Sequence, residues 1–146
     1  MTRQDLHSAL VTEWMEKIVR PLTPSRMVQT LEDTFAAMWR RAYLTLGEVT
    51  LSAIVDRILY NAKERFPILS SCKVEPSGLG TGDLRGRADS LPRDQLWGAM
   101  QFVLVEFLTV LGNLTAEILT PAMHATLTAT DGKSHNVQRN GEDAKS

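Results

Sequence analysis

The sequence predicts an all-α fold: a bundle of four main helices with a short extended or glycine-rich insert and a disordered C-terminal tail. Apolar residues recur every three or four positions along four segments, which is the spacing of one helix face. Proline and glycine cluster between those segments, and residues 129–146 have almost no apolar side chains. We therefore expect a single helical domain over residues 1–128, followed by a polar tail over residues 129–146.

The first helix is predicted over residues 3–20, where Pro21 would end it. Thr2 is a suitable N-cap, because its hydroxyl can accept a hydrogen bond from the first turn. The apolar stripe that defines this helix consists of Leu6, Leu10, Trp14, Ile18 and Val19. Such a stripe buries one face of the helix against neighbouring elements.

Two further helices are predicted over residues 24–46 and 50–66. Thr23 can cap the first of them, and the proline that follows it suits the first helical turn. The second has the most regular apolar face of the chain: Leu51, Ile54, Val55, Ile58, Leu59, Ala62 and Phe66. Gly47 lies between the two, and a single glycine is a weak helix breaker. The two segments are therefore either separate helices or one bent rod.

The insert comprises residues 68–90. Residues 68–74 are compatible with a short extended segment, and the proline and glycines after them mark a flexible connection. The fourth helix is predicted to begin near Ser90, a suitable N-cap, and to continue to about Leu119. A short final helix is predicted from Pro121, which follows a threonine as the proline of the second helix does.

The fourth helix contains the most apolar stretch of the chain, MQFVLVEFLTVLGNLTAEIL at residues 100–119. A membrane span needs about 20 apolar residues with few or no charges. Glu106 lies within this stretch, and a carboxylate near the centre of a bilayer is costly, so a membrane span is not favoured. A helix that is apolar over most of its circumference is normally buried on several sides. We therefore interpret the stretch first as the spine of the bundle.

A partner surface is the second interpretation of the same stretch, because one small bundle does not easily cover so wide an apolar circumference. Small residues along the helix would permit the close approach of a second copy. The residues predicted to form this homo-oligomeric interface are Gly98, Phe107, Leu108, Leu111, Gly112 and Ala116.

The overall composition argues against several classes of function. Sixteen Lys and Arg balance seventeen Asp and Glu, whereas duplex-binding domains usually carry a basic excess, so nucleic acid is not favoured as a partner. The only cysteine, Cys72, excludes an intramolecular disulfide and a multi-cysteine metal site. The first residues lack an apolar signal core, so we expect a cytoplasmic location.

The sequence predicts neither catalytic residues nor a metal site. The glycine-rich stretch at residues 78–87 matches neither the G-x-G-x-x-G fingerprint nor a P-loop, so a mobile connection is favoured over a phosphate cradle. The three histidines are scattered, and no second ligand stands three or four positions from His124. Cys72 has no basic neighbour beyond Lys73 to lower its pKa, which disfavours nucleophilic catalysis.

These observations favour a non-enzymatic regulatory or protein-interaction module of bacterial signalling that self-associates through its long C-terminal helix. The alternative is a sensor that holds a small ligand or haem between its helices. The residues assigned to that ligand site are Trp14, Trp39, Trp97, Met100 and His124. A third hypothesis is a DNA-binding regulator, because residues 46–66 resemble a recognition helix beside Arg40 and Arg41, although a base-reading face is lacking.

Overall fold

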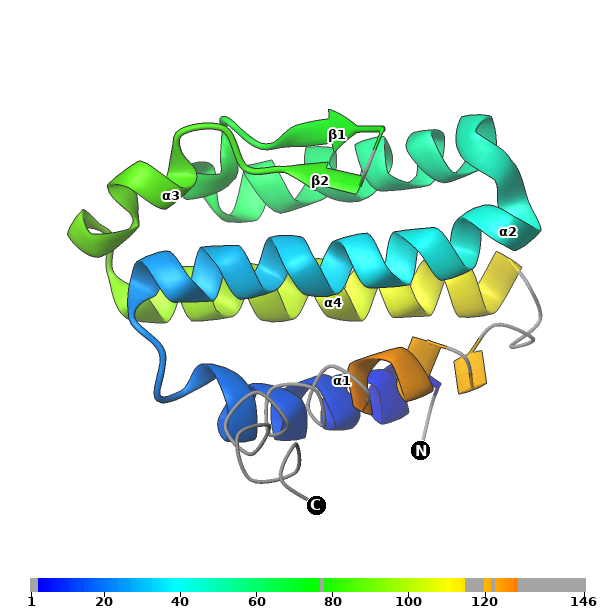
Figure 1. The fold of residues 1–146 in the computed structure, drawn as a ribbon, viewed down its shortest axis with the longest axis horizontal. Helices are drawn as coiled ribbons and strands as arrows, with labels where there is room; N and C mark the ends of the chain where they lie inside the picture. Colours follow the sequence, from blue (N-terminus) through cyan, green and yellow to red (C-terminus); the bar gives the residue numbers. More distant parts are fainter. Residues whose placement is uncertain (1–2, 77, 115–119, 122, 129–146) are drawn as a thin grey trace, which may run out of the picture.

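A computed structural model describes residues 3–76, 78–114, 120–121 and 123–128 (Figure 1). These residues are mostly helical, which confirms the all-α class, and they include one small two-stranded sheet. The elements in chain order are α1 (Arg3–Trp14), a π-helical turn (Met15–Val19), α2 (Pro24–Arg65), a 3-10 turn (Pro67–Leu69), β1 (Lys73–Glu75), β2 (Gly78–Gly80), α3 (Leu84–Arg87), a second 3-10 turn (Ala88–Ser90) and α4 (Arg93–Leu114). Residues 120–121 and 123–128 are also helical, as the sequence predicts.

The first helix changes from α-helical to π-helical hydrogen bonding near its end. In the π-helical turn, the amide of Arg20 donates to the carbonyl of Met15 at 2.9 Å. Carbonyl groups at the end of a helix lack partners within the helix. Here the Arg93 guanidinium, at the start of α4, donates to the carbonyls of Leu22 at 2.6 Å and Val19 at 3.3 Å. The beginning of α4 therefore holds the end of the first helix in place.

Gly47 divides α2 into two halves. Its φ of 79° and ψ of 171° are not helical, and the chain reverses direction there, so that the two halves lie side by side (Figure 1). The predicted cap is confirmed, because the Thr23 hydroxyl accepts a hydrogen bond from the amide of Arg26 at 3.3 Å. The sequence left open whether residues 24–66 form one bent rod or two helices, and the structure shows two helices joined at a glycine.

The insert contains a β-hairpin where the sequence predicted a flexible connection. The antiparallel strands pair Lys73 with Gly80, Val74 with Leu79 and Glu75 with Gly78. A Cβ added to Gly78 would lie 3.5 Å from the Cβ of Trp39, so β2 packs tightly on the first half of α2. Gly82 has a φ of +59° and a Cβ there would lie 2.7 Å from the Ser71 carbonyl, so the turn after β2 requires glycine.

At the start of α4, Ser90 does not fill the predicted role of N-cap. It lies in the second 3-10 turn, and its hydroxyl donates to the carbonyl of Arg87 at 2.7 Å. The first hydrogen bond of α4 runs instead from the amide of Leu96 to the carbonyl of Pro92, at 3.2 Å. The helix therefore begins at Arg93, three residues after the predicted cap.

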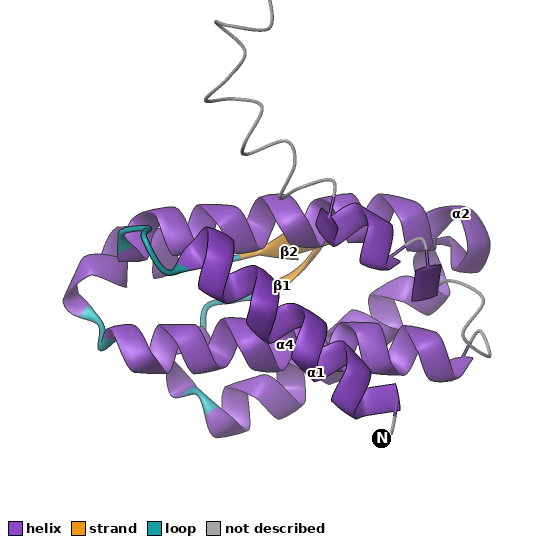
Figure 2. Cartoon of the chain, turned by 90° about the horizontal axis from the view of Figure 1, so that it is seen from below, coloured by secondary structure: helices purple, strands orange, loops and turns teal. Residues whose placement is uncertain are grey.

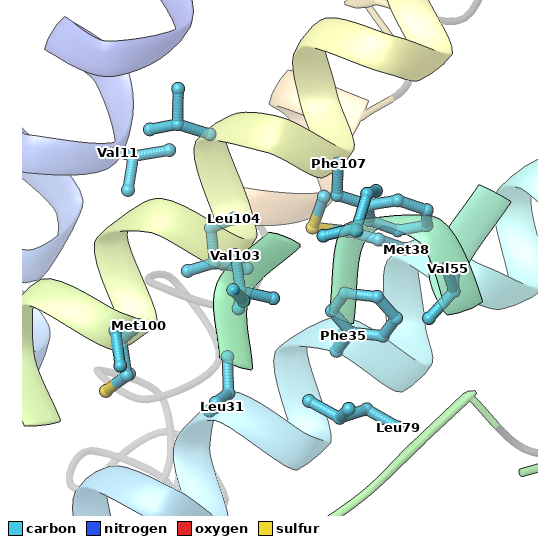
Figure 3. Packing of buried hydrophobic residues seen from close by; sticks show 14 of the residues in the cluster. Val11, Leu31, Phe35, Met38, Val55, Leu79, Met100, Val103, Leu104 and Phe107 are labelled. Carbon is cyan, nitrogen blue, oxygen red and sulfur yellow. The ribbon is translucent and has the colours of Figure 1, made fainter. Parts of the chain in front are cut away.

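α4 lies at the centre of the hydrophobic core, between α1 and α2 (Figures 1 and 3). Phe107 of α4 stacks on Phe35 of α2 with 4.4 Å between ring centroids and an interplanar angle of 16°. Both side chains are fully buried. The buried residues of α4 are Leu96, Ala99, Met100, Val103, Leu104, Val105, Phe107, Leu108, Leu111 and Gly112. Burial of apolar surface is the main favourable term in folding, so α4 is the spine of the domain.

Among the described residues, α4 is also the one helix long and apolar enough to cross a membrane. The core helix of a globular protein meets the same criteria of length and composition. In this structure 56% of its most apolar window is buried inside the chain. Packing within the domain therefore accounts for the composition of α4.

The last helical segment returns to the start of the chain. Seen from below, α1 crosses the other long helices obliquely (Figure 2), and His7 on α1 contacts His124 in the final segment. Met123 and Leu127 of that segment are buried. The predicted cap Thr2, the predicted end of the fourth helix at 115–119 and the predicted polar tail at 129–146 lie outside the described residues.

Candidate functional site

The five residues predicted to hold a ligand or haem lie in different surroundings. Trp97 is half-buried beneath the Arg20 guanidinium, which lies 5.4 Å from its ring centroid. Trp39 packs against β2, and His124 contacts α1. The remaining two are buried in the core: Trp14 and Met100. None of the five lines any of the three surface hollows described below.

His7 and His124 are 117 positions apart in the sequence but meet in the fold. The Nδ1 atom of His7 lies 3.0 Å from the Nε2 atom of His124, and the two rings are arranged edge to face. In such a pair one nitrogen donates and the other accepts, according to the tautomers. Within the described ranges, no group of three His, Cys, Asp or Glu side chains is placed to hold a metal ion. The contact therefore joins α1 to the final helical segment.

The residues predicted to form an interface on α4 lie mostly inside the chain. Phe107, Leu108 and Leu111 are at most 1% exposed, and Gly112 is also buried. Gly98 is half-buried, and a Cβ there would lie 3.1 Å from the ring of Phe66. Ala116 lies outside the described residues. These side chains therefore already pack within one copy of the chain.

The arginines of the glycine-rich insert are engaged by carboxylates. Arg85 forms an ion pair with Glu32 of α2, and the Thr81 hydroxyl donates to the same carboxylate at 2.6 Å. Arg87 forms an ion pair with Asp83 at 3.2 Å. A phosphate bound at this loop would have to displace those carboxylates. Arg85 therefore fastens the insert to α2, and Arg87 links residues within the insert, which is consistent with a structural role.

Cys72 is buried below the turn that follows β2. Burial raises the pKa of its thiol from 9.0 to about 11, although the nearby Lys63 ammonium opposes that rise. Its sulfur lies 4.0 Å from the carbonyl of Thr81. A thiol that stays protonated at neutral pH is a poor nucleophile, so Cys72 acts as a small core residue.

The second half of α2 carries two large apolar side chains that are exposed. Val49 is 85% exposed and Tyr60 is 63% exposed, which is unusual for side chains of this size. Val49, Ala53, Asp56 and Tyr60 follow one another at intervals of four, three and four residues, so they share one side of the helix. Together with Arg57 we call these residues the α2 ridge.

Three hollows flank the α2 ridge, and Ala53 lines all of them. The first, of about 520 Å³, lies between α2 and α4 and is lined by Val49, Ile54, Ile58 and Val110 among others. The second, of about 500 Å³, lies beside Tyr60. The third, of about 460 Å³, lies between α2 and the β-hairpin. Residues of the α2 ridge line all three hollows, and the largest hollow is the most apolar in its lining.

The charges on this face are mixed in sign. Asp56 and Arg57 are adjacent in the sequence, and both are exposed at the middle of the ridge. Glu48 lines the hollow beside the hairpin, and Glu106 of α4 lines the hollow between α2 and α4. Charged and apolar side chains therefore alternate along the α2 ridge.

Comparison with known proteins finds no match to a family model, to a curated protein or to a solved structure. The sequence alone does not single out Val49 or Tyr60, because two large apolar residues on a polar face make too weak a stripe to stand out. The signal that could have found them is their four- and three-residue spacing through Ala53 and Asp56.

Proposed function

We propose that this chain is a non-enzymatic protein-interaction module, with its four main helices arranged as a bundle, and that it works by self-association. The surface that we assign to self-association is the α2 ridge with the adjoining edge of α4. A cytoplasmic regulatory role in bacterial signalling is part of the proposal and rests on the architecture alone.

The observation that carries the proposal is the coincidence of exposed apolar side chains and hollows on one face. Val49 and Tyr60 are 85% and 63% exposed on the α2 ridge, and the ridge is flanked by concave surfaces. Scattered single apolar residues are normal on a protein surface, whereas an apolar group with shape complementarity is typical of an interaction site. α4 takes part through Glu106 and Val110, although its most apolar side is buried.

The arrangement of the ionisable groups supports a non-enzymatic role. Arg85 and Arg87 of the insert are engaged by the carboxylates of Glu32 and Asp83, and the Cys72 thiol stays protonated at neutral pH because burial raises its pKa to about 11. Asp56 and Arg57, the charges of the α2 ridge, are exposed and line the hollows of this face. Such charges are suited to orienting a partner.

Light scattering on the purified chain, over a concentration series from micromolar to millimolar, tests the proposal. We expect the molar mass to rise toward twice the 16.3 kDa of one chain. Val49→Glu should shift the protein toward monomer, because a carboxylate would be desolvated in the interface. Leu6→Glu is the matched control, since Leu6 is a 52% exposed leucine on α1. A wild-type chain that stays monomeric throughout would overturn self-association.

The same sample also tests the alternative of a sensor. Bound haem would give a strong visible absorbance band in freshly purified protein, and its removal would change the thermal midpoint. A colourless sample whose mass doubles with concentration supports the interaction module.

A further inference from the structure

We propose that the contact between His7 and His124 is a pH-sensitive switch, which releases the final helical segment from α1 when the solution becomes acidic. His7 is 1% exposed on α1, and its Nδ1 atom lies 3.0 Å from the Nε2 atom of His124. Histidine is the side chain whose charge ordinarily changes between pH 5 and 8. Neither residue lies on α2, so this inference goes beyond the proposed self-association and does not depend on it.

The histidine pair can hold one added proton but not two. With both rings neutral, one nitrogen donates and the other accepts, and 3.0 Å is an ordinary length for such a hydrogen bond. A single added proton still leaves one donor and one acceptor at the contact. When both rings are protonated, every ring nitrogen carries a hydrogen, so the hydrogen bond is lost. Two positive charges then repel each other at a site where His7 is shielded from water.

The number of bound protons sets the direction of the effect. Two separate histidine side chains in water both take up a proton below about pH 6.5. The docked pair takes up at most one, so in acid the released segment binds one proton more than the docked segment. Release is therefore favoured as the pH falls, and its equilibrium constant should rise by up to about ten-fold per pH unit below about pH 6. Above neutral pH both rings are uncharged, and the segment stays docked.

α4 places one charged side chain in the region beside His7. The two helices run antiparallel, because Gln101 of α4 donates to the hydroxyl of Thr12 at 2.7 Å and the start of α4 contacts the residues that follow α1. His7 therefore lies beside the part of α4 that follows Gln101. The charged residue of that part is Glu106, and it lines the hollow between α2 and α4.

The remaining charges belong to α1, to the π-helical turn and to the start of α4. Asp5 is two positions from His7, and residues at that spacing do not face each other on a helix. Within the described part of the final segment, His124 is the one ionisable side chain. The other ionisable residues of these elements are Arg3, Glu13, Glu16, Lys17, Arg93 and Asp94. None of them is a histidine, so the pair supplies the groups that ordinarily change charge between pH 5 and 8.

Release of the final segment would expose apolar side chains at one end of the domain. Met123 and Leu127 are each 1% exposed in the docked segment. Their burial opposes release, so the segment stays docked while the histidine pair is neutral. The stacked rings of Phe35 and Phe107 join α2 to α4 without the final segment. The switch therefore acts locally and leaves the other helices packed.

The methyl NMR signal of Met123, followed in the full chain between about pH 7.5 and 5, tests the switch. The signal is identified by its absence in Met123→Leu. In the wild type it should move from the position of a buried methionine toward that of an exposed one as the pH falls. In His124→Gln it should be nearly independent of pH, because glutamine can hydrogen-bond to His7 but cannot become charged. His7→Gln should give the same result from the other side of the contact.

His135→Gln is the matched control, because it makes the same substitution at the third histidine of the sequence. Its Met123 signal should follow the wild-type profile. Far-UV circular dichroism at both ends of the pH range verifies that the helical content is retained. A wild-type signal that does not move, or equal profiles in the wild type and the two glutamine variants of the pair, would overturn the switch. Loss of the helical signal over the same pH range would also overturn it, since global unfolding would then expose Met123.

Discussion

Gly47→Ala is expected to destabilise the protein without any steric clash. The φ of 79° and ψ of 171° at Gly47 lie in a region of backbone space that residues with a Cβ avoid. No atom lies within 4 Å of a Cβ built at this position. The whole effect is therefore backbone strain, which costs about 1–3 kcal/mol for a residue held in such a region.

Thermal and urea denaturation followed by circular dichroism measure this loss. For a domain of this size, a loss of about 1–3 kcal/mol lowers the thermal midpoint by about 4–12 °C. The chain could also relieve the strain by straightening α2. A straight helix of 42 residues would be about 63 Å long, so X-ray scattering would detect the opened form. Such an opened form could exchange its halves with a second copy.

Gly86→Ala is the matched control. Gly86 lies within α3, its φ is not positive, and no atom lies within 4 Å of an added Cβ. Alanine there should be neutral or stabilising by up to about 1 kcal/mol, because it reduces the freedom of the unfolded chain. If Gly47→Ala and Gly86→Ala had equal midpoints and an unchanged scattering profile, the left-handed hinge at Gly47 would be refuted.

Three further changes test the packing and the titration of the core. Phe107→Ala should cost about 3–5 kcal/mol in urea denaturation, because it removes the ring stacked on Phe35, and a loss below 1 kcal/mol would contradict the central position of α4. Because the pKa of the buried Cys72 thiol is raised from 9.0 to about 11, the unfolded chain loses this proton first as pH rises. Wild-type stability should therefore fall by about 2–3 kcal/mol between pH 9 and 11 relative to Cys72→Ala, and parallel pH profiles would contradict this. Glu32→Gln should weaken the hold on the Thr81 turn, seen as faster amide hydrogen exchange in β2 with α4 unchanged, whereas equal exchange would show that the ion pair is dispensable.

The sequence predicted the helical class because the apolar periodicity of each long segment is local information. The stripe through Leu51, Val55 and Ile58 belongs to one helix and needs no knowledge of the rest of the chain. Thr23 could likewise be identified as a cap from the proline that follows it. Gly47 lies between the two apolar stripes in the sequence. Whether the chain reverses direction there depends on whether the two halves of α2 can bury their faces against each other, which is a question of tertiary structure.

The features that escaped prediction depend on contacts between distant positions. The hairpin of β1 and β2 is short and rich in glycine, and β2 is held by burial against Trp39 of α2, more than thirty positions earlier. Glu32 fixes the same insert through Thr81, across 49 positions. Neither contact leaves a periodic pattern in the local sequence. Composition alone therefore gave a flexible connection for a segment that tertiary packing orders.

The location of the proposed interface also depends on contacts between distant positions of the chain. The wide apolar circumference of α4 indicates how much of its surface must be buried, but it does not indicate which chain buries it. Folding α2 back on itself at Gly47 supplies two helical surfaces from a single segment, and with α1 they cover Phe107, Leu108 and Leu111 within one copy. Apolar side chains that remain exposed lie on several helices, and Tyr60 is among those that belong to the α2 ridge. A hinge at one glycine is thus the reason that the proposed site of self-association lies on α2 and not on the most apolar helix.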